Sequence, residues 1–172
     1  MRAQLALLER IALLGPNGSG KTTLLRSLAP AVPAAYLPQR LDVLDDAASV
    51  LDNVRAAAPS LAAQQVRAGL ARFRVHGHTV DQRAGTLSGG ERFRVVLARL
   101  LLAEPPPQLL LLDEPTNNLD LDSVERLTEA LAAFRGTLVV ASHDHPFLRK
   151  VGCTRWWSVD GGLLEIAEPG HG

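Results

Sequence analysis

The chain has 172 residues, of which 47% are hydrophobic and 21% charged, a balance typical of one compact globular domain rather than of a disordered segment. The 18 basic and 18 acidic side chains cancel. No field of the whole molecule therefore draws the chain to nucleic acid or to an anionic membrane, and such a partner would need a local patch.

The apolar segments do not predict secretion or membrane insertion. The opening MRAQLALLERIALLG resembles a signal peptide only in its apolar residues, because Glu9 and Arg10 interrupt the run and no small-residue cleavage pattern follows. Glu104 and the prolines at 105–107 break the leucine-rich region, so no apolar stretch is long enough to cross a bilayer. The single cysteine, Cys153, excludes an internal disulfide framework and agrees with the reducing cytoplasm, where we expect the protein to lie.

The first half of the chain predicts two strands and three helices. Short apolar runs predict strands buried on both faces, and amphipathic stretches predict helices. In chain order the expected elements are a strand at 11–14, a helix at 21–28, a strand at 34–37, helices at about 50–58 and 61–73, and a loop at 76–86. Ser49 and Ser60 are the expected N-caps of the last two helices, and Pro30 ends the first helix.

The second half continues this alternation. An apolar stripe that includes Phe93 predicts an amphipathic helix from Glu91 onward, terminated by the prolines at 105–107. The remaining expected elements are a strand at 109–112, a helix that starts at 122 and includes Phe134, a strand at 137–141, and a hairpin at 155–159 and 163–166. Asp122 and Glu125 form a capping-box-like start for that helix. The alternation predicts an α/β domain with a largely parallel core sheet.

The segment GPNGSGKT, residues 15–22, matches the pattern G-x-x-x-x-G-K-[ST] between a predicted strand and a predicted helix, which indicates a phosphate-binding loop. Glycines let backbone N–H groups converge on phosphate oxygens at a helix N-terminus. We expect Lys21 to reach the β- and γ-phosphates and the Thr22 hydroxyl to ligate Mg²⁺. The alternative is a glycine-rich turn with an exposed lysine, but Lys21 is one of only two lysines in the chain.

Asp113 and Glu114 follow the leucines of a predicted buried strand. Such a strand delivers both carboxylates to the carboxyl edge of a parallel sheet, where α/β proteins bind ligands. We expect Asp113 to hold the Mg²⁺ shell and Glu114 to orient and polarise the attacking water. The alternative is an acidic loop that begins a helix.

Two further motifs allow both a structural and a functional interpretation. In LSGGE, residues 87–91, a capping box explains Ser88 and Glu91, but paired glycines in a first helical turn cost helix propensity and favour close approach of an anion. His143 follows the last core strand and could contact a terminal phosphate. His143 and Gln39 alone would pass as structural or surface residues.

In this order GPNGSGKTT, YLPQ, LSGGE, LLLLDEPTNNLD and VVASHD resemble the nucleotide-binding domain of ATP-binding cassette (ABC) proteins, and the likeness extends through almost the whole chain. The resemblance implies a P-loop NTPase fold with a mostly parallel core sheet, a reduced β-subdomain, a short helical subdomain and a C-terminal hairpin. It implies one ATPase domain over 1–172, with its core at about 1–39 and 88–172 and its helical subdomain at about 40–87.

The resemblance also implies residue roles. The expected nucleotide contacts are Gly15, Pro16, Asn17, Gly18, Ser19, Gly20, Lys21, Thr22, Thr23, Ser88, Gly89, Gly90 and, in the D-loop at 117–120, Asp120. The expected catalytic residues are Glu114, His143 and Gln39, and the expected Mg²⁺ ligands are Thr22, Gln39 and Asp113. In this family the signature of one domain closes on ATP held by another, which implies a homodimer or a pair with a related ABC cassette.

LSGGE, EPTNNLD and ASHDHPFL resemble the F subfamily, the soluble ABC proteins that act on ribosomes, and TRWWSVDGGLLEI resembles its closing hairpin. This implies an ATPase with ribosome or RNA contacts, although Arg92, Arg94 and Arg99 are also compatible with plain solvated surface. One alternative is the ATP-binding subunit of a transporter, docked on a membrane subunit. Another is a reduced nucleotide-binding module with little or no hydrolysis, because no aromatic residue precedes Tyr36 to stack on adenine.

Overall fold

The computed structural model of the chain describes residues 8–39, 41–117, 119–161 and 163–167. It divides into two compact units. The first unit consists of Met1–Gln39, Gln108–Asn117 and Thr128–Gly172, and the second of Arg40–Pro107 and Asn118–Leu127. A single ATPase domain with a helical subdomain at 40–87 stays a prediction.

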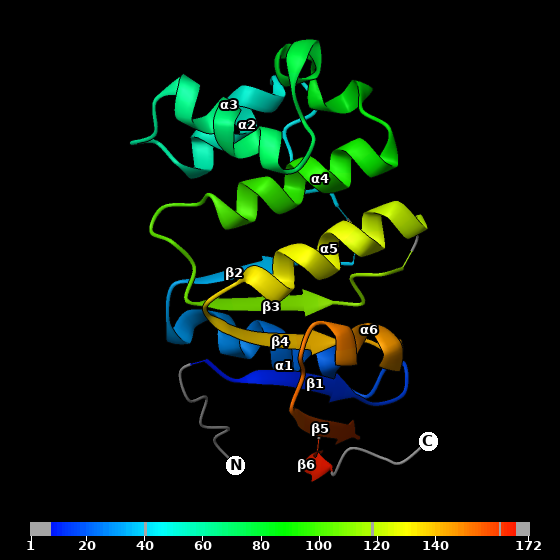
Figure 1. Ribbon diagram of the computed structural model, residues 1–172. Helices are drawn as coiled ribbons and strands as arrows, with labels where there is room; N and C mark the ends of the chain where they lie inside the picture. Colours follow the sequence, from blue (N-terminus) through cyan, green and yellow to red (C-terminus); the bar gives the residue numbers. More distant parts are fainter. Residues whose placement is uncertain (1–7, 40, 118, 162, 168–172) are drawn as a thin grey trace. The chain divides into compact units, whose positions relative to one another are not determined.

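The first unit is built on one six-stranded sheet in the order β2-β3-β4-β1-β5-β6 (Figure 1). The strands are β1 (Arg10–Leu14), β2 (Ala34–Leu37), β3 (Leu109–Asp113), β4 (Thr137–Ala141), β5 (Arg155–Asp160) and β6 (Leu163–Ala167). All neighbours from β2 to β5 pair in parallel, and β6 pairs antiparallel to β5. The predicted α/β class, parallel core and closing hairpin are confirmed, and no strand end differs from its predicted position by more than one residue.

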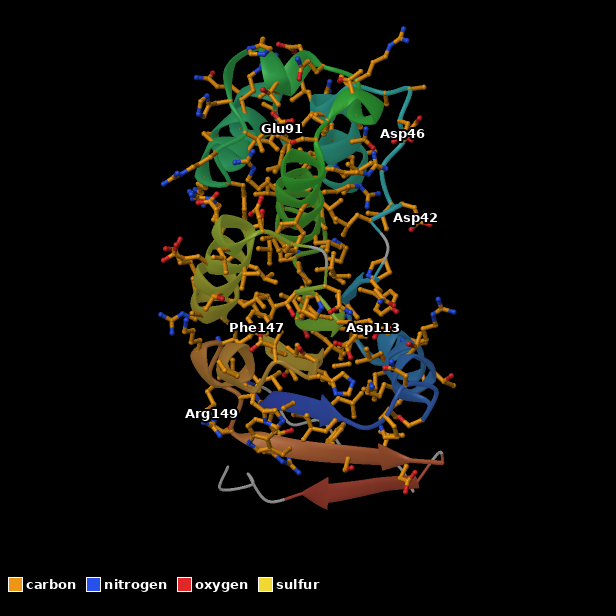
Figure 2. All side chains as sticks on the ribbon, turned by 90° about the vertical axis from the view of Figure 1, so that its right-hand side faces the viewer. Asp42, Asp46, Glu91, Asp113, Phe147 and Arg149 are labelled. Carbon is orange, nitrogen blue, oxygen red and sulfur yellow. The ribbon has the colours of Figure 1, made fainter. Side chains whose placement is uncertain are left out.

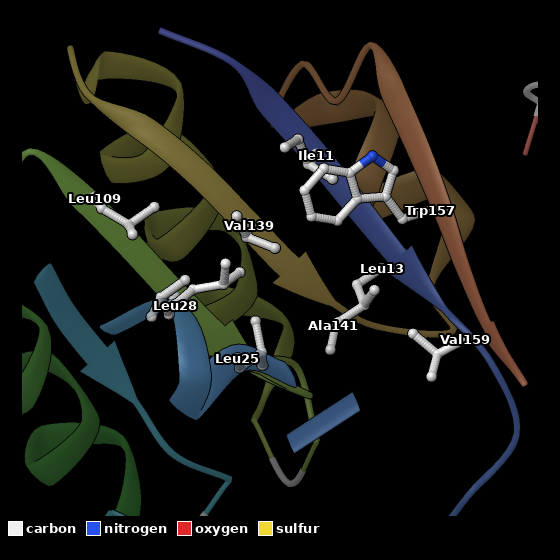
Figure 3. Packing of buried hydrophobic residues seen from close by; sticks show 10 residues of the cluster. Ile11, Leu13, Leu25, Leu28, Leu109, Val139, Ala141, Trp157 and Val159 are labelled. Atoms are coloured by element: carbon white, nitrogen blue, oxygen red, sulfur yellow. The ribbon is translucent and has the colours of Figure 1, made fainter. Parts of the chain in front are cut away.

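Helix α1 (Lys21–Leu28), which has the predicted bounds, packs on one face of this sheet. Its Leu25 and Leu28 contact alternate residues of four strands (Figure 3). On β3 these residues are Leu109 and Leu111. Because successive strand side chains point to opposite faces, the next residue of β3 on the α1 face is Asp113. The core packing therefore directs this carboxylate toward α1.

The opposite face carries helix α6 (His145–Lys150), which was not predicted from the sequence. Trp156 of β5 stacks on His145, with ring centroids 5.6 Å apart and planes 14° apart. The Asp144 side chain caps α6 by accepting a hydrogen bond from the N–H of Phe147, whose side chain is buried (Figure 2). A helix of six residues is too short to show a clear helical period, so the Asp144 cap and the proline in the first turn were the usable signals.

Arg10 of β1 fastens the C-terminal ends of two helices to the sheet. Helix α5 (Leu121–Ala133) belongs to the first unit from Thr128 on. The Arg10 guanidinium donates hydrogen bonds to the carbonyl oxygens of Leu131 (2.9 Å), Ala132 (3.3 Å), Phe134 (2.7 Å) and Val151 (2.6 Å). Carbonyls at a helix C-terminus lack intrahelical partners and carry partial negative charge, so a guanidinium suits them.

The second unit is helical. It contains α2 (Val50–Ala57), α3 (Ala63–Arg72), α4 (Gly89–Leu101), the 3₁₀ turns η2 (Gly77–Asp81) and η3 (Ala84–Thr86), and the residues of α5 up to Leu127. The predicted helices are confirmed, except that α5 ends at Ala133, one residue before Phe134. The segment at 76–86, expected to be loop, contains both 3₁₀ turns because Gln82 and Thr86 donate N–H hydrogen bonds to carbonyls three residues earlier. No helix that the structure describes is long and apolar enough to span a bilayer.

Two of the predicted helix caps are confirmed in the second unit. The Ser49 hydroxyl accepts a hydrogen bond from the N–H of Asp52, at 3.0 Å. Ser88 and Glu91 form the expected capping box, since Ser88 accepts from the Glu91 N–H and its own N–H donates to the Glu91 carboxylate. The first turns of α2 and α4 are thereby stabilised.

The other two predicted caps are wrong. Ser60 does not cap α3, because its N–H and hydroxyl bind the Glu104 carboxylate, and α3 begins after Ala62 instead. Asp122 does not cap α5, because the Asp120 carboxylate accepts the Ser123 N–H at 2.7 Å. Asp122 lies within the helix and pairs with Arg126 one turn later.

The glycine loop after β1 fits closely against β5. Gly15 has φ +143°, and a Cβ added there would lie 2.3 Å from the carbonyl oxygen of Val159. Gly18 has φ +82°, but a Cβ added there meets nothing within 4 Å. The first glycine is therefore required by both backbone conformation and packing, and the second by backbone conformation alone.

We expect Gly15→Ala to lower the free energy of unfolding by about 2–4 kcal/mol, because the loop must move off a backbone carbonyl and also adopt a strained φ. The matched variant Gly18→Ala should lower the free energy of unfolding by about 1 kcal/mol, from backbone strain alone. Urea unfolding of both variants and of the wild type measures the difference. Equal losses for the two alanines would contradict the packing of Gly15 against β5.

Candidate functional site

A cavity of about 890 Å³ lies at the carboxyl ends of the strands in the first unit. It is lined by these predicted site residues: Pro16, Asn17, Gly18, Gly20, Lys21, Thr22, Thr23, Gln39, Asp113, Glu114 and His143. They follow β1, β2, β3 and β4, four neighbouring parallel strands whose carboxyl ends share one edge. The topology thus brings together residues more than 100 positions apart in the chain.

The glycine loop leads into this cavity at the start of α1. Gly20 is the N-cap of α1 and provides no side-chain hydrogen bond, so the first N–H groups of the helix have no side-chain cap. An uncapped helix N-terminus with no acidic residue in its first turn favours an anion. Of the predicted loop residues, Gly15 and Ser19 lie outside the cavity lining, and Ser19 is buried.

Lys21 is buried at the floor of the loop, with 7% of its surface exposed. Its ammonium donates hydrogen bonds to the carbonyl oxygens of Gly15, at 2.5 Å, and Pro16, at 3.3 Å. The same ammonium lies 3.3 Å from His143 Nε2 and 3.8 Å from Glu114 Oε1. A cation held between the loop carbonyls and a carboxylate can exchange these contacts for phosphate oxygens.

Asp113 lies at the end of β3 on the α1 side, as its alternation with Leu111 requires (Figure 2). Its Oδ2 oxygen accepts a hydrogen bond from the Thr22 hydroxyl at 2.6 Å and one from the Tyr36 hydroxyl at 3.1 Å. Burial, and next the charge of Asp113, raise the pKa of Tyr36, so this hydroxyl remains a donor at neutral pH. Thr22, Gln39 and Asp113 supply oxygen atoms around one cavity, which fits the ligand preference of Mg²⁺.

Glu114 has an unusual backbone conformation, with φ +47°. In a regular strand it would point to the face opposite Asp113, but here both side chains line the cavity. The Glu114 N–H remains bonded to the carbonyl of Ala141 at 2.8 Å, which holds the turn in place. A non-glycine residue held in this region is strained and indicates a functional constraint.

The Oε1 atom of Glu114 is buried and accepts no hydrogen bond from any residue that the structure describes. His143 Nε2 lies 3.3 Å from it, too poorly aligned for a hydrogen bond. Buried carboxylate oxygens are normally satisfied, so this one still lacks a hydrogen-bond donor. A water molecule poised to attack a phosphate would be such a donor.

The second unit holds the predicted signature residues. Beyond the Ser88 cap, a Cβ added at Gly89 would meet nothing within 4 Å, whereas one added at Gly90 would lie 3.5 Å from the Asp120 carboxylate and from Ser123. The structure therefore brings Gly90 and Asp120 together. Hydrogen bonds from the N–H and then the hydroxyl of Ser123 lower the pKa of Asp120 and keep it ionised. Nucleotide contacts by this group stay a prediction.

Several residues in the cavity were not predicted as site residues. Ser142 and Asp144 flank His143 in the lining, and Thr116 and Asn117 follow Glu114. Tyr36 was considered only as an aromatic residue, although it bonds directly to Asp113. In the sequence, only its position three residues before Gln39 indicated that Tyr36 lies near the site. Asn118 of the predicted D-loop lies outside the described residues.

Known proteins that are similar to this chain are described as ABC or ATP-binding proteins. The family model described as "ABC transporter" matches residues 31–117. "Probable ATP-binding protein YheS" of Haemophilus influenzae is 46% identical over 155 residues, which cover 82% of this chain and 24% of that protein. "ABC transporter F family member 5" of Arabidopsis thaliana is 34% identical over 172 residues, covering 91% and 24%. The chain thus spans about a quarter of the length of the curated relatives it matches.

Solved structures show the same fold. The dimeric structure of MJ0796, a bacterial ABC transporter cassette, has a TM-score of 0.79 at 20% identity and covers 98% of this chain and 89% of that one. A post-hydrolysis state of the same cassette, bound to ADP and Pi, has a TM-score of 0.76 and covers 94% and 87%. This likeness confirms the predicted P-loop NTPase fold. The family match over half of the chain shows that it belongs to the ABC transporter family, and its relatives include an F-family member.

Proposed function

We propose that the chain binds ATP with Mg²⁺ in the first-unit cavity and hydrolyses the terminal phosphoanhydride bond. The observation that carries this proposal is the buried cluster of Lys21, Asp113 and Glu114 beside the uncapped N-terminus of α1. Phosphoryl transfer asks a protein mainly to position groups and to stabilise charge. The cavity can do both, because it contains a lysine, two carboxylates and a row of backbone N–H groups.

Each residue has a role that follows from its contacts. The N–H groups at the start of α1 and the Lys21 ammonium bind the phosphates. Thr22, Asp113 and Gln39 would hold Mg²⁺, which when bound neutralises phosphate charge. Glu114 accepts a hydrogen bond from the attacking water at its Oε1 atom, which has no hydrogen-bond donor among the described residues, and orients that water. His143, which lies near both Lys21 and Glu114, donates to the terminal phosphate.

The active form is a head-to-tail sandwich with a second copy or a related cassette. Gly89 and Gly90 stand at the N-terminus of α4, where the Ser88–Glu91 capping box leaves space beside Gly89. Backbone N–H groups at such a helix start favour an anion. The resemblance to ABC domains supports the terminal phosphate of a partner's ATP as that anion, since the signature residues of one domain close on the nucleotide of the other.

Glu114→Gln should reduce phosphate release at least about 100-fold, because the amide cannot polarise the attacking water as a carboxylate does. ATP binding should persist, and ATP should convert this variant to a dimer in light scattering. Lys21→Ala should lose ATP binding, and Glu129→Gln, the same exchange on the exposed side of α5, should hydrolyse ATP as the wild type does. If the Glu114→Gln variant remains monomeric with ATP, a sandwich of two copies of this chain is wrong; if it hydrolyses at the wild-type rate, the role of Glu114 is wrong.

We further propose that the cassette works in the cytoplasm on ribosomes. The LSGGE signature and the asparagine pair at 117–118 resemble the F subfamily, and an F-family member is among the relatives. The Glu114→Gln variant with ATP should therefore sediment with ribosomes, because blocked hydrolysis prolongs the closed state. The Lys21→Ala variant should remain in the supernatant. If both variants sediment equally, or neither does, the ribosome proposal falls while the ATPase proposal stands.

A further inference from the structure

Tyr36 is the only tyrosine of the chain and reaches the candidate cation site from strand β2. The parallel register pairs Tyr36 with Leu111 of β3. Asp113 is the next residue of β3 on the same face, so Tyr36 and Asp113 are diagonal cross-strand neighbours. The Tyr36 hydroxyl uses this proximity to donate its hydrogen bond to Asp113 Oδ2, at 3.1 Å.

Two donors hold the Asp113 carboxylate from two elements. Thr22 approaches from α1 and Tyr36 from β2, and both hydrogen bonds end on Oδ2. Among the residues that the structure describes, none donates a hydrogen bond to Oδ1. Since Asp113 lines the cavity, Oδ1 is the oxygen available to a hydrated cation.

The terminal torsion of an aspartate is intrinsically broad, so its carboxylate plane is set by its hydrogen bonds. With Thr22 alone the carboxylate can rotate about a single contact, whereas two donors on one oxygen fix the plane. Asp113 is 6% exposed, and the hydroxyls of Thr22 and Tyr36 are the donors that hold its Oδ2 oxygen. The Tyr36 ring also packs against the α1-face core, which limits the movement of its hydroxyl.

We propose that Tyr36 is a positioning residue for divalent-cation binding, which acts by orienting the carboxylate of Asp113. This inference rests on the proposed function, because it takes Asp113 as part of the cation site. The proposal predicts which binding affinity falls when the hydroxyl is removed. The Tyr36 hydroxyl contributes to the affinity for the cation and not to the affinity for the nucleotide itself.

The test uses Tyr36→Phe, which removes the hydroxyl and keeps the ring in the core. Mn²⁺ serves as the probe, and its binding to the ATP-loaded chain is followed by electron paramagnetic resonance. A hydrogen bond to a charged group is worth a factor of about ten or more, but this bond also exists without the cation, so only part of that factor, about two- to tenfold, should appear as weaker Mn²⁺ binding. ATP affinity in EDTA, measured with a fluorescent analogue, should equal that of the wild type.

Ser27→Ala is the matched control, because it removes a hydroxyl of α1 that bonds to the Leu24 carbonyl at 2.7 Å and not to Asp113. Its Mn²⁺ affinity should not change. An unchanged Mn²⁺ affinity in Tyr36→Phe overturns the role of Tyr36 and leaves the ATPase proposal intact. A parallel loss of metal-free ATP affinity also overturns it, since that would indicate general damage. Failure of the wild type to bind ATP would instead remove the proposed function and this inference together.

A second measurement needs no substitution at Tyr36. Because the chain contains one tyrosine, incorporation of 3-fluorotyrosine gives one protein ¹⁹F signal. Addition of Mg²⁺ to the ATP-loaded chain should shift this signal, because the cation changes the charge at the Asp113 carboxylate that the phenol contacts. The Lys21→Ala variant, which cannot load ATP, should show no shift. A signal that stays fixed in the wild type overturns the inference.

Discussion

The hydrogen bond from Thr22 to the buried Asp113 carboxylate joins α1 to β3, and the candidate site depends on it. Leu109 and Leu111 bury one face of β3 under α1, and Asp113 is the next residue on that face. The packing that stabilises the sheet therefore also fixes the carboxylate. A buried charge is costly unless it is hydrogen bonded, and Thr22 with Tyr36 meets that requirement. The apolar core and the acidic site are two results of the same alternating strand.

Glu114 differs from Asp113, because its proposed role requires a departure from regular strand structure. Strand alternation would direct it away from Asp113, and the positive φ turns it into the same cavity. There it lies 3.8 Å from the Lys21 ammonium and 3.3 Å from His143. Two adjacent carboxylates thus obtain different surroundings, one between hydroxyl donors and the other beside cationic or ionisable groups. Different surroundings permit different roles, in cation binding and in water activation.

Local patterns predicted what depends on local interactions. The apolar runs of β2, α1 and β4 and the Ser88–Glu91 box appear where expected, since each is decided within a few residues. The wrong caps arise where a distant residue competes for the predicted cap, or where two nearby residues could both serve as the cap. Ser60 is engaged by Glu104, 44 positions away. Asp120 and Asp122 are both good caps, and it is Asp120 that accepts the Ser123 N–H. The Tyr36–Asp113 bond spans 77 positions and depends on strand order, which no single segment encodes.

We propose that the first-unit cavity holds the triphosphate of ATP over the start of α1. A crystal structure of the Glu114→Gln variant grown with ATP and Mg²⁺ would show where the nucleotide binds. We expect phosphate oxygens against the N–H groups at residues 18–22, and a Lys21 ammonium that has left the Gly15 carbonyl for a phosphate oxygen. Nucleotide bound away from this loop, or a Lys21 still bonded to Gly15 with ATP present, would contradict it.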